Sequence, residues 1–185
     1  MPKRKGLLAV VLVGVLWAAG VGAAPQRVRL PEGNAHGFLI VRTLAGEAIA
    51  YGELVQKPTR GLITSRLLLH FNDGSRYDET VVFSQKDVFR LERYQLTQRG
   101  PSFPQATIAF DRKSGQYRVR QQDTKDSEAQ TARGPLVMPP DLYNGMTTTL
   151  MKNVPPGASA TGQMVAFTPE PRLLTMVLTP EGEET

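Results

Sequence analysis

Glu79 is the residue of this sequence that best fits a role in acid–base chemistry. It falls on the face of a predicted strand that otherwise carries apolar residues. A carboxyl group in such surroundings can serve as a general acid or base. Asp78 is adjacent in the strand and therefore points to the opposite face, so the two cannot act as a local pair. Glu53 and Asp111 are the more distant carboxylates that could complete a reacting pair with Glu79.

A structural role for Glu79 competes with the catalytic one. An arginine of the following strand, Arg90 or Arg93, would form an ion pair with it, and buried carboxylates often have such partners outside active sites. We favour the structural role and predict no catalytic residue. Glu79 stays the candidate for the alternative function, a carboxylate-dependent hydrolase or isomerase.

Other reactive groups lack the spacing that their chemistry needs. The two histidines, His36 and His70, are far apart and form no H-x-x-H or H-E-x-x-H pattern, so no metal site is predicted. The chain has no cysteine, which excludes disulfides, thiolate nucleophiles, Cys-ligated metals and a lipid-attachment cysteine. No G-x-S-x-G, S-x-x-K or phosphate-binding glycine loop occurs, so we predict no cofactor.

The first 23 residues have the layout of a secretory signal peptide. Lys3, Arg4 and Lys5 precede an apolar run from Leu7 to Ala19, and small residues precede a cleavage site after Ala23. The alternative is an uncleaved anchor helix, but the strongly apolar part is short for a membrane span, which needs about 20 residues. We therefore predict an exported protein, periplasmic or secreted, whose membrane contact is limited to this signal.

The basic character of the chain belongs largely to that signal. The net charge is +5, with 22 Lys and Arg against 17 Asp and Glu; without residues 1–23 it is +2, with 19 against 17. Arg112, Lys113, Arg118 and Arg120 lie around one predicted hairpin, which a solvated outer sheet face explains. A small net charge together with export predicts that nucleic acid is not a partner.

Short apolar–polar alternations separated by glycine, proline and asparagine predict a β-rich domain. The predicted strands lie near 36–43, 48–56, 61–71, 75–84, 88–98, 105–111 and 116–122, with two more near 161–168 and 172–179. Short successive connections favour an antiparallel meander. The polar stretch 121–133 is either a long exposed loop or an edge strand.

The hairpin around Asn72-Asp73-Gly74 can be predicted in register. A three-residue loop pairs Leu69 with Tyr77 and Ile63 with Phe83, which keeps the apolar residues of both strands on one face. Gly74 then occupies the left-handed position of the loop. This register leaves Glu79 on the apolar face, opposite Leu67.

One short helix is predicted after the sheet. Leu142, Met146 and Leu150 recur at helical spacing, Pro140 or Asp141 suits a helix start, and the segment 154–157 (VPPG) ends it. Its threonines and Gly145 weaken it, so it must dock on the sheet. We predict a signal peptide over 1–23, one domain over 24–180 and a disordered acidic tail over 181–185. The fold class is mainly β: an antiparallel meander forming a curved sheet or partial barrel with one docked helix.

The apolar face of the sheet has two interpretations, a core or a ligand-binding surface. The residues that would bind a ligand are Leu67, Leu69, Phe71, Tyr77, Phe83 and Phe103. Phe103 belongs to a rigid loop, 98–104 (QRGPSFP), which could close over a ligand or plug the end of the sheet as a structural corner.

Several motifs together resemble a set of exported bacterial proteins of unknown function. They are DGS at 73–75, DET at 78–80, FSQ at 83–85, QRGPSFP at 98–104 and PPDLYNGM at 139–146. The resemblance covers most of the chain after the signal and implies no activity or catalytic residue. At the level of fold, the order of strands, helix and two further strands is similar to the half-barrel of periplasmic lipoprotein carriers, whose apolar hollow binds acyl chains.

The expected function is that of an exported, non-catalytic binding module for an apolar ligand or a cell-envelope partner. Besides the hydrolase or isomerase, a third hypothesis is a structural subunit that pairs with another chain through an exposed sheet edge. The sequence does not specify the oligomeric state.

Overall fold

The computed structural model describes residues 24–124 and 126–179 of the 185-residue chain. The predicted signal peptide and the predicted acidic tail lie outside the described residues. None of the helices in the described part is long and apolar enough to cross a membrane.

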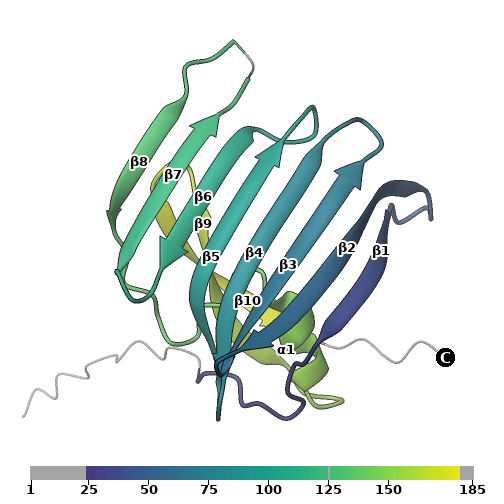
Figure 1. Ribbon diagram of the computed structural model, residues 1–185, viewed down its shortest axis with the longest axis vertical. Helices are drawn as coiled ribbons and strands as arrows, with labels where there is room; N and C mark the ends of the chain where they lie inside the picture. The colour runs from purple at the N-terminus through teal and green to yellow at the C-terminus, as the bar shows by residue number, and fades with distance from the viewer. Residues whose placement is uncertain (1–23, 125, 180–185) are drawn as a thin grey trace, which may run out of the picture.

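Eight consecutive strands form one antiparallel sheet in the order of the chain, as the short connections predict (Figure 1). They are β1 (Ala35–Arg42), β2 (Ala48–Thr59), β3 (Leu62–Phe71), β4 (Arg76–Gln85), β5 (Phe89–Arg99), β6 (Gln105–Asp111), β7 (Gln116–Gln122) and β8 (Gln130–Pro135). A helix, α1 (Thr147–Asn153), and a hairpin of β9 (Ala160–Phe167) and β10 (Pro171–Leu178) follow. The meander and the single short helix are confirmed.

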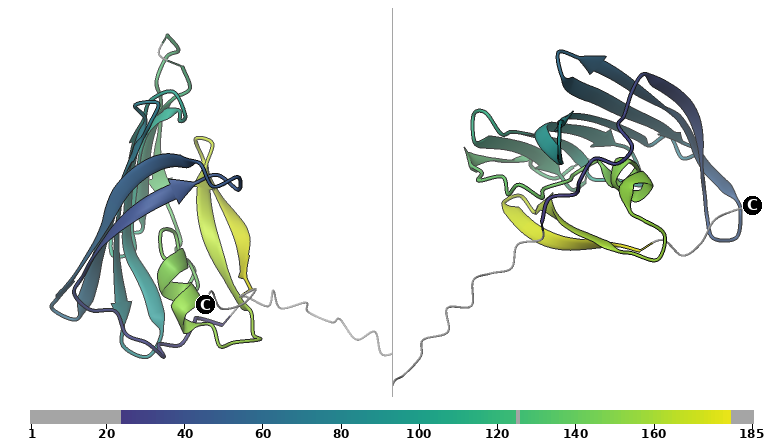
Figure 2. Two further views of the ribbon diagram at one scale, coloured as in Figure 1. Left: turned by 90° about the vertical axis from the view of Figure 1, so that its right-hand side faces the viewer. Right: turned by 90° about the horizontal axis from the view of Figure 1, so that it is seen from below.

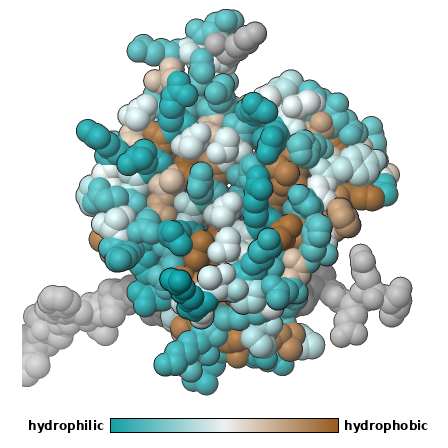
Figure 3. Space-filling model, in the orientation of Figure 1, coloured by the Kyte–Doolittle hydropathy of each residue, from teal (hydrophilic) through white to brown (hydrophobic). Residues whose placement is uncertain are grey.

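The large sheet is curved, and α1 and the β9–β10 hairpin lie on its inner side (Figure 2). Residues that face this inner side alternate along each strand with residues that face away, as a pleated strand requires. Figure 3 views the outer side, which presents mostly hydrophilic side chains with apolar residues scattered among them.

The hairpin of β3 and β4 has the predicted register. Leu69 lies opposite Tyr77, Ile63 opposite Phe83 and Leu67 opposite Glu79. Gly74 has a φ of +86°, the left-handed conformation that a three-residue loop requires and that glycine adopts without strain. The pattern of apolar residues was sufficient here because a slip by one residue would turn the whole apolar set to solvent.

The polar stretch near residue 130 ends in an edge strand, β8, rather than in loop alone. The predicted start of the helix, at Pro140 or Asp141, is wrong. The helix begins only at Thr147, because the backbone of residues 141–143 pairs with β9 instead: Tyr143 N donates to Gln163 O, and Gln163 N donates to Asp141 O. Gly145, at a φ of +69°, separates this segment from the helix.

The core lies between the inner face of the sheet and the elements packed on it, α1 and the β9–β10 hairpin, which we call the cover. Tyr94 stacks on Phe110 with ring centroids 4.9 Å apart, and Phe167 of β9 contacts the Phe110 ring at 5.8 Å. Leu142, Met146 and Leu150, the residues at helical spacing, are all buried in this core. The predicted docking face of the helix is thus apolar, although its first turn is not helical.

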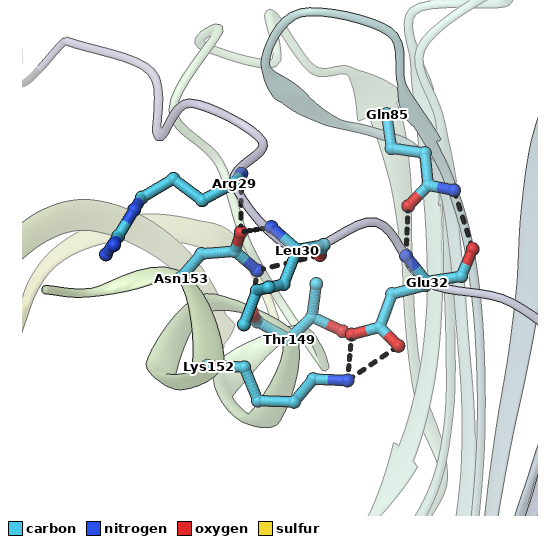
Figure 4. Close-up of polar contacts among 7 residues, drawn as sticks. All are labelled: Arg29, Leu30, Glu32, Gln85, Thr149, Lys152 and Asn153. Atoms are coloured by element: carbon cyan, nitrogen blue, oxygen red, sulfur yellow. Dashed lines mark hydrogen bonds and ion pairs between the residues drawn. The ribbon is translucent and has the colours of Figure 1, made fainter.

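The N-terminal segment 26–32 crosses the helix and fixes it to the sheet (Figure 4). Asn153, fully buried at the end of α1, accepts hydrogen bonds from the backbone N–H groups of Arg29 and Leu30, both at 2.8 Å. Its amide donates to Thr149 O at 2.8 Å and to Leu30 O at 3.3 Å.

Glu32 completes this attachment on two sides. Its carboxylate oxygens lie 2.6 and 2.7 Å from Lys152 Nζ of α1. Its backbone N–H and carbonyl pair with the side-chain amide of Gln85 on β4, both at 2.7 Å. The segment therefore joins the helix and the sheet, and we call residues 26–32 the strap.

Candidate functional site

A cavity of about 200 Å³ lies on the inner side of the sheet, between strands β1–β4 and the start of α1. Four aliphatic side chains line it, one from each of these strands: Leu39, Leu54, Leu67 and Val81. The remaining lining residues are Ser65, Glu79, Gly145, Thr147 and Thr148. An apolar hollow with a few convergent polar groups is the usual form of a ligand site, although this one is smaller than the roughly 300–1,000 Å³ that holds a drug-sized ligand.

Glu79 contributes the charged group of this cavity. It is only 6% exposed, yet one of its two carboxylate oxygens receives two hydrogen bonds: the Tyr77 and Tyr94 hydroxyls donate to Oε1 at 2.8 and 2.7 Å. Gly145 lies against the same carboxylate, and a Cβ there would come within 2.9 Å of Oε2. Two tyrosines and one glycine therefore position the carboxylate at the wall of the cavity.

The two tyrosines are strongly affected by this arrangement. Burial and the neighbouring Glu79 charge both raise the pKa of the Tyr94 hydroxyl, and the same two causes raise the pKa of Tyr77. Both hydroxyls thus stay protonated around neutral pH, where they act as hydrogen-bond donors to Glu79.

The predicted ion pair of Glu79 with an arginine of β5 is wrong. Arg90 lies 3.7 Å from Glu92, and Arg93 lies 4.0 Å from Asp111. The reason is the face of the sheet: Tyr94 points inward to Glu79, so its neighbour Arg93 points outward. Tyrosines rather than arginines donate to Oε1 of the buried carboxylate, which the sequence did not indicate.

The distant carboxylates proposed as partners of Glu79 also lie on the outer face. Glu53 pairs with His36 at 2.8 Å, and Asp111 follows the inward-facing Phe110. The structure therefore does not assemble a pair of carboxylates around Glu79. Asp78, adjacent to Glu79, is bound on the outer face by Arg66 at 2.7 Å, and this hydrogen bond lowers the pKa of the Asp78 carboxyl.

The sequence-predicted ligand residues have different environments. Leu67 lines the cavity, and Leu69, Phe71 and Tyr77 continue along the same inner face as half-buried side chains. Phe83 is 1% exposed and packs against Phe89 in the core, so it is not available to a ligand. Phe83 differs from the other predicted residues because the same apolar face belongs to the buried core at that end.

Phe103 closes the far end of this face. Its ring meets Phe71 edge-on at 5.1 Å and lies 6.2 Å from the ring of Tyr77. The loop that carries it is fixed to the β3–β4 turn: Ser102 N donates to Ser75 Oγ at 2.8 Å, and Ser102 Oγ donates to Asp73. The Ser102 hydrogen bond, followed by that of the Ser75 backbone, lowers the pKa of Asp73. This geometry is that of the structural corner.

Leu39, Leu54 and Tyr94 were missed as site residues. Leu39 lies in a continuous apolar run, Phe38 to Val41, and Leu54 is followed by the apolar Val55, so alternation could not tell which of these side chains face inward. The inward orientation of Tyr94 depends on a bulge in β5, where Phe83 pairs with Leu91 but Val82 pairs with Arg93. An extra residue of this kind shifts every later side chain to the other face, and no turn residue marks it.

The remaining candidates have structural environments. Within the described residues, no group of three or more His, Cys, Asp or Glu side chains could bind a metal ion. Arg112 does not contribute to a basic surface, since its guanidinium donates to the carbonyls of Leu91, Met138 and Pro139 at 2.6 to 2.9 Å. Comparison with protein-family models, with curated proteins and with solved structures gives no match for this chain.

Proposed function

We propose that the protein is an exported, non-catalytic binding module that takes an apolar ligand on the inner face of its sheet. One observation carries this proposal: six inner-face side chains of β1–β4 are left partly exposed beside the cavity, although they are apolar. They are Leu39, Leu54, Leu67, Leu69, Phe71 and Tyr77, which we call the open strip. An apolar surface that a fold leaves uncovered is typical of a binding site.

The strap is compatible with removal of the predicted signal peptide. Its first tertiary hydrogen bond is from Gln26 N to the Tyr143 hydroxyl, at 2.7 Å. Cleavage after Ala23 would therefore leave the strap complete. The resemblance to exported bacterial proteins and to lipoprotein-carrier half-barrels agrees with this location and with a hollow for acyl chains.

Binding of an apolar fluorophore tests the proposal. We expect 1-N-phenylnaphthylamine to gain fluorescence with the purified protein, and Leu67→Trp to abolish the gain because the indole fills the cavity. Leu68→Trp is the matched control, since Leu68 is also half-buried but lies on the outer face of the same strand. Unchanged binding by Leu67→Trp, or loss caused only by Leu68→Trp, would contradict a site on the inner face.

The edge of β10 supports a second candidate function, pairing with another chain. Within the described part, β10 pairs only with β9, and its Leu173 and Val177 are 51% and 61% exposed. An unpaired strand of this kind can accept a further strand. Light scattering coupled to size-exclusion chromatography tests self-pairing: we expect a dimer that Val177→Pro dissociates, and a monomer at high concentration would rule self-pairing out.

A further inference from the structure

An apolar ligand on the open strip would leave one polar atom of the cavity without a partner, the second oxygen of the Glu79 carboxylate. Oε1 accepts both tyrosine hydroxyls, whereas Oε2 receives no hydrogen bond from residues 24–124 or 126–179. We infer that the cavity binds an aliphatic primary amine, with the ammonium group on Glu79 Oε2 and the alkyl chain along the open strip. This inference rests on the proposed function and names the ligand class of the same site.

Gly145 makes this oxygen reachable. A Cβ at this position would lie 2.4 Å from Val81 Cγ2 and 2.9 Å from Oε2, so any side chain would displace the carboxylate or cover it. The φ of +69° at Gly145 is also one that other residues rarely adopt. The backbone turn before α1 therefore leaves space where Oε2 meets the cavity.

The charge of the cavity favours a cation. Of the residues that line it, Glu79 alone is ionisable, and its two protein partners are neutral hydroxyls. A buried carboxylate without a positive partner is costly, and a ligand ammonium would supply both the charge and the missing donor. A ligand carboxylate would meet repulsion at the same place.

The open strip fits an unbranched chain that starts at Glu79. Leu67 lies opposite Glu79, and Leu69 and Phe71 follow on the same face of β3. Leu67 and Phe71 are four steps apart along an extended strand, a distance of roughly 13 Å. Phe103 packs on Phe71 at 5.1 Å and ends the strip there. These dimensions suit an alkyl chain of medium length.

Displacement of 1-N-phenylnaphthylamine by three ligands of equal chain length tests the inference at neutral pH. We expect decylamine to bind roughly tenfold or more tightly than decanol, which is the size of one charge-assisted hydrogen bond. Decanoate should bind more weakly than decanol. Glu79→Gln, which keeps an oxygen for the two tyrosines, should abolish the preference for decylamine over decanol.

The outcomes separate this inference from the proposed function. If the fluorophore does not bind, the proposed function and this inference are both wrong. If it binds and none of the three ligands displaces it, the inference alone is overturned. If decanol displaces it and decylamine binds no more tightly, the inference is overturned while the apolar site stands. A preference for decylamine that survives in Glu79→Gln overturns it as well.

If circular dichroism shows that Glu79→Gln does not fold, lysine variants at two exposed positions test instead whether the Glu79 charge causes the preference for decylamine. Thr148→Lys places an ammonium at the lining of the cavity and should weaken decylamine binding several-fold more than decanol binding. Thr175→Lys, at an exposed position of β10 outside the cavity lining, adds the same charge and should change neither. Equal effects of the two lysines would contradict a charge at Glu79 as the cause.

Discussion

The inner face of the sheet contains two regions that have similar residues but differ in solvent exposure. Over β5–β7, Tyr94, Phe110 and Val119 are buried beneath the β9–β10 hairpin. Over β1–β3, Leu39, Leu54 and Leu67 alternate in the same way but stay partly exposed. The difference shows that alternation selects which side chains face inward, whereas the position of the cover determines which of them become core.

Glu79 lies at the boundary between these two regions. One of its hydroxyl donors, Tyr94, belongs to the covered region, and the other, Tyr77, belongs to the open strip. A buried polar group needs partners, so this carboxylate couples the end of the core to the start of the cavity. Comparing the two regions by mutation therefore tests the interpretation of both.

Removing the same side chain from each region should give the largest contrast. Leu91→Ala, at a fully buried position of the covered region, should lower the free energy of unfolding by about 2–5 kcal/mol, because it leaves a cavity in packed core. Leu67→Ala, in the open strip, should cost about 1 kcal/mol or less. Urea denaturation of the two variants measures this difference. Equal losses would show that the open strip is core.

Detaching the strap should have the next largest effect, since it loosens the cover. Asn153→Ala leaves the Arg29 and Leu30 N–H groups without their acceptor and should cost about 2–4 kcal/mol. Asn153→Asp keeps an acceptor for both groups and should cost clearly less. Urea denaturation compares the variants, and hydrogen exchange should show faster exchange in α1 of Asn153→Ala. An equally stable Asn153→Ala would contradict the role of the strap.

Alkaline titration tests the boundary itself. The pKa values of Tyr77 and Tyr94 are raised above the ordinary value of about 10, so the fold favours their protonated forms. Their contribution to stability is complete below that pH and is lost as the pH rises above it. The free energy of unfolding should fall above about pH 10, by up to about 1.4 kcal/mol per pH unit for each tyrosine.

Replacing both tyrosines by phenylalanine supplies the control for this titration. Tyr77→Phe/Tyr94→Phe should be less stable than wild type near neutral pH but should lose stability less steeply above pH 10. Urea denaturation at a series of alkaline pH values measures both slopes. Identical slopes would contradict raised pKa values of the two hydroxyls.

Local patterns were enough to predict the meander and one register. Ile63, Leu67 and Leu69 share a face at period two, and Gly74 permits the turn, so β3 and β4 could be aligned from their own residues. The helix start failed at Asp141 because its backbone pairs with β9, which lies about twenty residues later in the chain. Helix propensity depends on the local sequence and therefore cannot predict a pairing with a strand so far along the chain.

The candidate site depended even more on distant parts of the chain. Its placement on the inner face, with Glu79 opposite Leu67, followed from alternation alone. The donors to Glu79 did not, because Tyr94 reaches it through a bulge in β5 and Gly145 through the turn before α1. The bulge lies in the pairing of the consecutive strands β4 and β5, where no residue type marks it. The contact of Gly145 with Glu79 joins segments that are far apart in the sequence.

The sequence by itself determined the strand alternation, the absence of cysteine chemistry and the face on which Glu79 lies, since these depend on residue type and on a period of two. Only the tertiary structure decided which apolar residues are core, which are open, and which hydroxyls bind the carboxylate. The physical reason is that burial and hydrogen bonding depend on what lies across a face. Across the inner face of this sheet lie α1 and the β9–β10 hairpin, which follow the sheet in the chain, and the strap, which precedes it.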